Sequence, residues 1–194
     1  ISTVAKKYGI EKIIRPKRFN DSKALGEDVF KFSYDQAKKK LNLLDRNIKY
    51  IVLLFANSPV TTKLIDKGIN ILNKNKKFDS AVSTSVYNMW SPLRARKLTK
   101  KGNLVPFVNF NYFGDPKKLN CDRDSQGNVY YADMSVSVVR PSCLTQMKKG
   151  LLPQKWMGKF IAPIFSEAGG DLDYPWQLPN IEYWLKKNGF KIKR

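Results

Sequence analysis

The chain has 194 residues, of which 36 are Lys or Arg and 16 are Asp or Glu, so its formal net charge at pH 7 is +20. A hydrophobic content of 42% and an aromatic content of 12% suffice for a buried core in one domain of ordinary size, which disfavours intrinsic disorder despite the charge. His is absent and the cysteines are Cys121 and Cys143, so the chain alone cannot build a Ser-His-Asp triad, a Cys-His pair, or a His-rich or four-ligand zinc site.

The cysteines and the apolar runs bear on the compartment. Cys121 and Cys143 lack a C-x-x-C spacing, which suits a reducing cytosol better than a disulfide scaffold, although a disulfide stays open. The longest apolar run, Ile51 to Ala56, is too short to span a membrane, and no charged and apolar leader precedes it. We therefore expect a cytoplasmic protein with no membrane partner. Because a helical pattern begins directly at Ile1, we also expect the natural N-terminus to lie upstream.

The positive charge raises the question of nucleic-acid binding, since Lys and Arg neutralise phosphates. The lysines occur as scattered pairs and triples, such as Lys38 to Lys40 and Lys148-Lys149, mostly at expected helix ends and turns. Lys also outnumbers Arg, whereas base-edge recognition favours the planar fork of Arg. A small anionic substrate is thus favoured over nucleic acid as the partner.

Periodicity and turn residues predict alternating helices and strands. In chain order we expect a helix over 3–8 closed by Gly9, a strand over 12–14, a helix over 27–41, a strand over 50–55, a helix over 62–72, a strand over 80–86, a strand over 135–139, a helix over 141–149 ended by Gly150, a strand over 160–164, and a helix over 179–188 capped by Gly189. The continuous apolar run over 50–55 is typical of a central strand in a parallel sheet, and the strand over 80–86 completes a β-α-β unit.

The stretch from Leu93 to Tyr131 has a different character. The turn signals Lys101-Gly102-Asn103 and Gln126-Gly127-Asn128 separate short mixed segments there, which predicts hairpins that project from the main sheet.

Three motifs carry chemistry: 53–59 (LLFANSP), 91–94 (SPLR) and 170–173 (GDLD). The first ends a strand and opens a helix, where α/β proteins bind nucleotides. In order and spacing these segments resemble the cytidylyltransferases that activate sialic acid and related nonulosonic acids, the CMP-sialic acid synthetases. The similarity covers nearly the whole chain and includes 4–9 with Arg15-Pro16, 65–72 with 79–82, and the closing Ile181-Glu182 helix.

The resemblance assigns the nucleotide to the turn formed by Asn57, Ser58 and Pro59. The family has threonine-serine-proline at this turn with a glutamine two residues earlier, and here Phe55 replaces the glutamine and Asn57 the threonine. Ser58 is disfavoured as a nucleophile because no base is available to activate it.

For the acidic sugar, the resemblance implies Arg94 and Arg123 as partners of the carboxylate, which Arg can pair with two hydrogen bonds. A second arginine of the family falls at Tyr131 here, and the family's following asparagine-glycine pair falls at Asp133-Met134. Residue types alone leave other interpretations open: Arg94 as an exposed edge-strand cation, and Arg123 in a surface ion-pair cluster. Tyr87, Met89 and Trp90 could form the wall of a substrate pocket or belong to the core, and for Tyr130 and Tyr131 a dimer contact is a third option.

Asp171 and Asp173 match the family's metal-binding aspartate pair, which implies Mg²⁺ or another divalent cation. Residues i and i+2 of an extended segment point to one side, so two carboxylates there can share a hard cation, and Gly169-Gly170 allow a tight backbone turn beside a ligand. Without the other motifs, a solvated turn or a helix cap would be the better interpretation of this pair.

The resemblance therefore implies an α/β fold of three layers, a Rossmann-like nucleotide-diphospho-sugar transferase with a mainly parallel sheet, one domain over 1–194 and a dimerisation hairpin inserted at about 93–134. The expected activity transfers CMP from CTP to the anomeric hydroxyl of the acidic sugar and releases pyrophosphate. The expected oligomer is a homodimer. The family's glycine-rich triphosphate loop has no counterpart in this sequence, so we expect it upstream. The alternatives are a transferase for Kdo or a polyol phosphate, and a non-catalytic basic module that binds polyanions.

Overall fold

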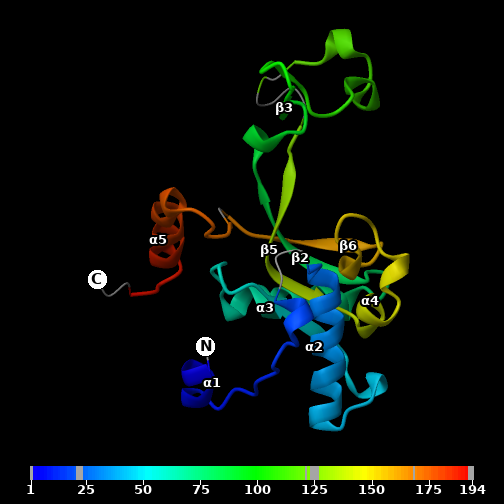
Figure 1. Ribbon diagram of the computed structural model, residues 1–194, viewed down its shortest axis with the longest axis vertical. Helices are drawn as coiled ribbons and strands as arrows, with labels where there is room; N and C mark the ends of the chain where they lie inside the picture. Colours follow the sequence, from blue (N-terminus) through cyan, green and yellow to red (C-terminus); the bar gives the residue numbers. More distant parts are fainter. Residues whose placement is uncertain (1, 21–23, 121, 123–126, 168, 192–194) are drawn as a thin grey trace. The chain divides into compact units, whose positions relative to one another are not determined.

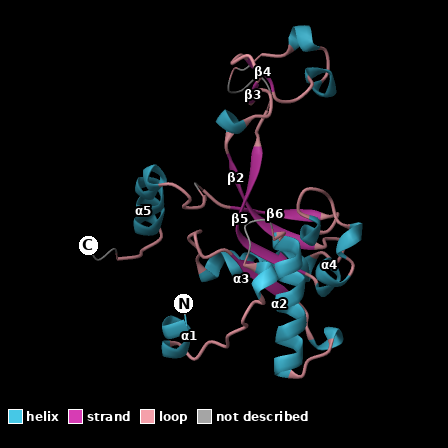
Figure 2. Ribbon diagram, viewed as in Figure 1, coloured by secondary structure: helices cyan, strands magenta, loops and turns pink. Residues whose placement is uncertain are grey.

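The computed structural model describes residues 2–20, 24–120, 122, 127–167 and 169–191. The described residues form a mixed α/β protein with an open four-stranded sheet and a separate two-stranded hairpin (Figures 1 and 2). The helices are α1 (Ser2–Lys7), α2 (Gly26–Leu41), α3 (Thr62–Lys74), α4 (Pro141–Thr145) and α5 (Leu178–Lys187). The strands are β1 (Ile51–Leu54), β2 (Ser80–Val86), β3 (Arg96–Leu98), β4 (Leu104–Pro106), β5 (Tyr130–Val139) and β6 (Ile161–Phe165).

Short 3₁₀ turns join these elements. They lie at Lys17–Phe19, Asp45–Asn47, Asn88–Trp90, Phe110–Phe113, Pro116–Lys118, Met147–Lys149, Lys155–Met157 and Pro175–Gln177.

The larger sheet has the strand order β1-β5-β2-β6 and contains both pairing directions. The Asp79 amide donates to the Phe160 carbonyl and the Ser166 amide to the Thr84 carbonyl, so both strands advance together and β6 runs parallel to β2. Beside β5, the Arg140 amide donates to the Asp79 carbonyl and the Tyr87 amide to the Val129 carbonyl, so β5 runs antiparallel to β2. The sheet is therefore mixed.

The chain divides into two compact units, each with its own buried side chains. The first comprises 1–53, 65–81 and 137–162, and the second comprises 54–64, 82–136 and 163–194. In the first unit α2 packs against α4, and the rings of Phe30 and Trp156 meet edge to face at 5.3 Å. In the second unit Val82, Val136, Ile164 and Trp184 are buried. Burial of apolar side chains of this kind is the main favourable contribution to folding.

The hairpin of the second unit follows the turn signal in its sequence. β3 pairs antiparallel with β4, with Arg96 opposite Pro106 and Leu98 opposite Leu104, and Gly102 adopts a φ of +82° in the connecting turn. Figure 1 shows this hairpin in green, between the segment that leaves β2 and the segment that returns to β5.

Most expected elements are confirmed, with shifts of at most two residues at their ends, except that β5 begins five residues before the strand expected over 135–139. Three expectations about the elements are wrong. Residues 12–14 form no strand, and Ile14 is 84% exposed. β1 was expected as a central strand, but it lies at one end of the strand order, beside β5, and is only half-buried. The helix expected over 141–149 ends at Thr145, because Gln146 leaves helical geometry with φ −121° and ψ 35°. The second hairpin turn begins at Gln126, which lies outside the described residues.

Candidate functional site

The turn that follows β1 exposes the amide side chain of Asn57. The Ser58 amide donates to the Phe55 carbonyl at 3.2 Å, which closes the turn before α3. Ser58 and Pro59 are half-buried, whereas Asn57 is exposed. Asn57 is therefore the member of the predicted nucleotide turn whose side chain is most accessible to a ligand.

The acidic segment 171–173 contacts this turn. The Leu172 amide donates to the Asn57 carbonyl at 2.9 Å, and the Asn57 side-chain amide donates to Oδ1 of Asp173 at 3.2 Å. The amides of Asp173 and Tyr174 both donate to Oε1 of Gln177 at 2.7 Å. These bonds join two of the motifs from the sequence and fix the position of the backbone that carries the acidic pair.

Asp171 and Asp173 are the residues of this segment that could hold a divalent cation. Both residues are exposed, and carboxylate oxygens are the ligands that this hard cation prefers. No group of three or more Cys, Asp or Glu residues that could hold a metal occurs in the described part of the chain. Mg²⁺ needs no such cage, since it typically takes one or two carboxylates and fills its other positions with water and substrate phosphate. Asp171 and Asp173 lie six and eight residues after the end of β6 at Phe165, in an irregular segment.

Arg94 lines an open pocket with aromatic walls. The SPLR segment forms a turn in which the Arg94 amide donates to the Ser91 carbonyl, and Ser91 and Leu93 are buried. The backbone that carries the exposed Arg94 side chain is therefore held in place. The pocket has a volume of about 690 Å³. Its lining residues are Val86, Tyr87, Asn88, Met89, Trp90, Arg94 and Asn128.

Tyr131 belongs to the same aromatic cluster. Trp90 stacks on Tyr87 with ring centroids 4.3 Å apart, and its other neighbour is the Tyr131 ring, which meets it edge to face at 4.9 Å. Such aromatic contacts contribute about 0.5–1.5 kcal/mol beyond the area they bury. The predicted sugar residues Arg94 and Tyr131 are thus gathered around Trp90. Arg123, the third predicted sugar residue, lies outside the described residues.

Tyr87 connects this pocket to the acidic segment. Its hydroxyl donates to the Gly169 carbonyl at 2.8 Å, two residues before Asp171. Burial, and then the nearby Asp133 carboxylate, raise the pKa of the Tyr87 hydroxyl, so the group stays protonated and able to donate. Of the two expected places for Tyr87, the structure supports the pocket wall: the residue is half-buried and lines the pocket.

Sequence reasoning missed the buried carboxylate of Asp133. Asp133 is 8% exposed and accepts hydrogen bonds from Ser83 and Ser85 on the neighbouring strand β2. The available signal was an aspartate within a strand pattern, opposite a strand with serines at alternate positions, since a buried carboxylate requires such donors.

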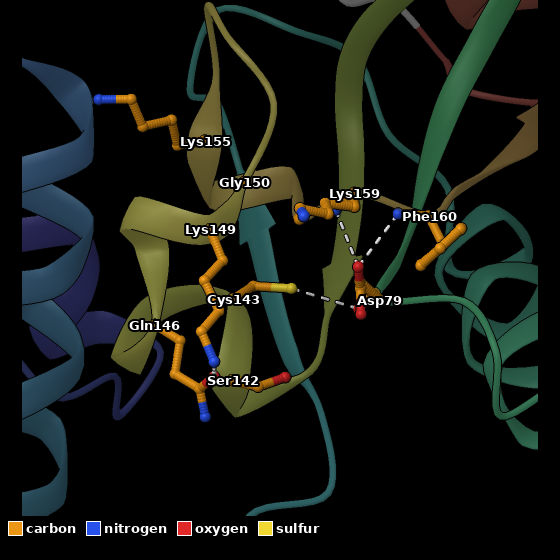
Figure 3. Close-up of a pocket in the computed structure, with 10 residues that line it drawn as sticks. Asp79, Ser142, Cys143, Gln146, Lys149, Gly150, Lys155, Lys159 and Phe160 are labelled. Atoms are coloured by element: carbon orange, nitrogen blue, oxygen red, sulfur yellow. Dashed lines mark hydrogen bonds between the residues drawn. The ribbon is translucent and has the colours of Figure 1, made fainter.

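A second cavity, of about 220 Å³, lies in the first unit and contains none of the predicted site residues (Figure 3). Oδ2 of Asp79 accepts the amides of Lys159 and Phe160 there, and the Cys143 thiol donates to the Asp79 carbonyl at 3.3 Å. Figure 3 shows Lys155 extending away from the cavity, while Lys149 is directed to Gln146 and donates to it. The ammonium groups therefore do not converge on one point.

Comparison with known proteins gives no match to this chain, either among protein-family models or among curated proteins. Within the residues that the structure describes, no helix has the length and apolar character needed to cross a membrane.

Proposed function

We propose that the protein is a nucleotidyltransferase that transfers CMP from CTP to the anomeric hydroxyl of a sialic-acid-like nonulosonic acid. The observation that carries this proposal is the contact between the Asn57 turn and the Asp171–Asp173 segment, which lie 116 residues apart at Asn57 and Asp173. A nucleotidyltransferase needs nucleotide-binding groups beside a site for a divalent cation, because the cation neutralises the phosphates.

The proposal includes a three-layer Rossmann-like fold. The succession β1, α3, β2 and the parallel pairing of β2 with β6 support it. The backbone at Met134 supports it independently, because Met134 adopts a φ of +58°, a conformation that favours glycine. The resembled family has the glycine of its asparagine-glycine pair at this position.

In this proposal Asp171 and Asp173 hold Mg²⁺, which when bound neutralises phosphate charge and lowers the pKa of an oxygen that it contacts. The Asn57 side chain donates to Asp173, so the proposed nucleotide turn contacts the acidic segment. Phe55 and Asn57 replace the family's glutamine and threonine, so the contacts to the base differ from the family's.

Arg94 and the aromatic cluster form the proposed sugar site. The guanidinium supplies a cation for the carboxylate of the sugar, and the walls of Tyr87 and Trp90 offer apolar surface for the carbon skeleton and its acyl substituents. Tyr131 stands where the family has an arginine, which predicts an acceptor other than ordinary sialic acid.

The chemistry requires positioning rather than a covalent intermediate. The anomeric oxygen forms a bond to the α-phosphorus of CTP, the bond from that phosphorus to the oxygen bridging to the β-phosphate breaks, and pyrophosphate leaves. The hydroxyl proton passes to water. Orientation of the two substrates and charge neutralisation supply the acceleration, so a site without His suffices.

The test is release of pyrophosphate from CTP with Mg²⁺ and a panel of nonulosonic acids that includes Kdo, using the protein with any residues that its gene encodes before Ile1. We expect release with CTP and one acid. Asp171→Asn lowers turnover by roughly 100-fold or more, because the cation loses a ligand. Asp66→Asn, at an exposed carboxylate of α3, is the matched control and retains turnover. Turnover by Asp171→Asn at the rate of the control would refute the metal role, and silence across the panel by a folded protein would refute the activity.

The proposal also includes a homodimer formed through the hairpin. Leu98 and Leu104 lie opposite each other on β3 and β4 and are 70% and 69% exposed, which is apolar surface that a second copy would cover. The double variant Leu98→Lys with Leu104→Glu retains a favourable cross-strand pair but removes this surface, so we expect it to sediment as a monomer while the original protein sediments as a dimer. Equal sedimentation of the two proteins would contradict this role of the hairpin.

A further inference from the structure

The buried carboxylate of Asp133 has hydrogen-bond donors at both of its oxygens. Oδ1 accepts the Ser83 hydroxyl and, at 3.0 Å, the Ser135 amide, while Oδ2 accepts the Ser85 hydroxyl at 3.0 Å. Ser83 and Ser85 are 0% and 2% exposed. A charge that has been removed from water is retained only with such partners, so this arrangement fixes the carboxylate in one place.

The same carboxylate abuts the segment that leads to the acidic pair. A Cβ on Gly169 would overlap the Asp133 carboxylate, so only glycine fits there. The Gly169 amide donates to Oγ of Ser85 at 3.2 Å, and Tyr87 holds the Gly169 carbonyl from the other side. Ser85 thus connects Asp133 to the Gly169 backbone, and Gly169 is held at both of its polar groups.

Three residues after Gly169, at Leu172, the backbone is again held by a hydrogen bond. Leu172 donates to the Asn57 carbonyl, and Asp173 is bonded to both Asn57 and Gln177. Asp171 therefore lies between two anchored positions, Gly169 and Leu172. Loss of the first anchor would release one end of this short segment.

We propose that Asp133 and Ser85 are positioning residues that hold Gly169 so that Asp171 and Asp173 are presented together to a divalent cation. This inference rests on the proposed function for the role of the cation. Partners of metal ligands commonly change metal affinity by about 10–100-fold when they are removed, because they orient the ligands.

Ser85→Ala tests this directly, because it removes the link between Asp133 and Gly169 without adding volume. Ser137→Ala is the matched control: Ser137 is also fully buried in the sheet, and its hydroxyl has no hydrogen-bond partner among the described residues. The measurements are Mn²⁺ affinity by water-proton relaxation and hydrogen exchange at the Leu172 amide. We expect Ser85→Ala to weaken Mn²⁺ binding by about 10-fold or more and to speed exchange at Leu172, and Ser137→Ala to change neither.

A kinetic split separates positioning from general destabilisation. In Ser85→Ala the Mg²⁺ concentration for half-maximal pyrophosphate release rises, and saturating Mg²⁺ restores kcat. Asp133→Asn keeps the side-chain shape and one acceptor oxygen, so it retains most of the Mn²⁺ affinity that Ser85→Ala loses.

The outcomes distinguish this inference from the proposed function. If the unaltered protein binds Mn²⁺ and Ser85→Ala binds it equally well, the positioning role is overturned and the proposed function stands. If the unaltered protein binds no Mn²⁺ and releases no pyrophosphate, the proposed function and the cation's part in this inference both fall. In that case faster exchange at Leu172 in Ser85→Ala alone still supports the anchoring role, and unchanged exchange refutes it.

Discussion

At the scale of single residues, Cys143 shows how burial determines chemistry. Its side chain is 4% exposed and its thiol donates to the Asp79 carbonyl (Figure 3). Burial, and then the charge of Asp79, raise the pKa of the Cys143 thiol from 9.0 to about 11. The thiolate is the reactive form of cysteine, so Cys143 is inert as a nucleophile at neutral pH.

The raised pKa of Cys143 makes stability fall in alkali. The folded state favours the neutral thiol, so this contribution to the free energy of unfolding is fully present below pH 9 and is lost as the pH rises to about 11. Cys143→Ser lacks a group that titrates in this range but keeps a donor for Asp79. We therefore expect the free energy of unfolding, measured in urea at pH 8, 9.5 and 10.5, to fall more steeply in the unaltered protein than in Cys143→Ser. Parallel curves would contradict the prediction.

The residues proposed for the site could be singled out before their surroundings were known. The acidic pair, the Asn57 turn and Arg94 were chosen from the resemblance of their motifs to a known family, and their chemistry stays a prediction. The burial of Asp133 could not be predicted, because it depends on Ser83 and Ser85, which are about 50 residues away in sequence and reach Asp133 only through the pairing of β5 with β2.

At the scale of elements, Arg140 joins the end of α3 to the start of β2. Its Nε donates to the Phe78 carbonyl and its Nη2 to the Leu72 carbonyl, both at 2.9 Å. Leu72 lies in the last turn of α3, where carbonyls lack partners within the helix. The guanidinium also lies over the Tyr50 ring at 5.5 Å. Nε and Nη2 of Arg140 thus donate to carbonyls of two separate backbone segments.

Arg140→Lys removes this geometry while retaining the charge. A single ammonium cannot reach both carbonyls as the planar fork does, and hydrogen bonds from charged groups contribute about 1.5–3 kcal/mol each. We expect the free energy of unfolding to fall by about 2 kcal/mol in chemical denaturation. Arg46→Lys, at an exposed position, is the control and should change stability by less than about 0.5 kcal/mol. Equal effects of the two substitutions would show that the contacts of Arg140 contribute nothing specific.

The elements themselves follow from periodicity where their packing is ordinary. α2 and β2 begin and end within one residue of expectation, because their apolar spacing and flanking turns agree with the fold. Residues 12–14 form no strand, because a short apolar run forms a strand only beside a partner. The position of β5 between β1 and β2 is set by pairing between segments that are far apart in the sequence. Strand order of this kind leaves no local signal in the sequence.

At the scale of the whole molecule, the net charge of +20 is a cost to the folded state. Ion pairs such as Lys31–Asp35 and Lys38–Asp45 lie at the surface, where such pairs contribute little. With more than twice as many cations as anions, most cationic side chains repel one another, and compaction increases that repulsion.

Salt should therefore stabilise this protein. Raising NaCl from 20 to 500 mM shortens the range of charge repulsion, and each 1 kcal/mol gained raises the Tm by about 2–4 °C for a chain of this length. Reversing Lys76, Lys77, Lys100 and Lys101 to Glu lowers the net charge by about eight units at exposed positions, so the variant should gain less from salt. A Tm that is independent of salt, or an equal gain in the variant, would contradict charge repulsion.

The same salt series separates the two classes of function: a polyanion-binding module loses DNA affinity steeply between 50 and 200 mM NaCl, whereas a transferase that recognises one carboxylate and one triphosphate depends on Asp171 and Arg94 at every salt concentration.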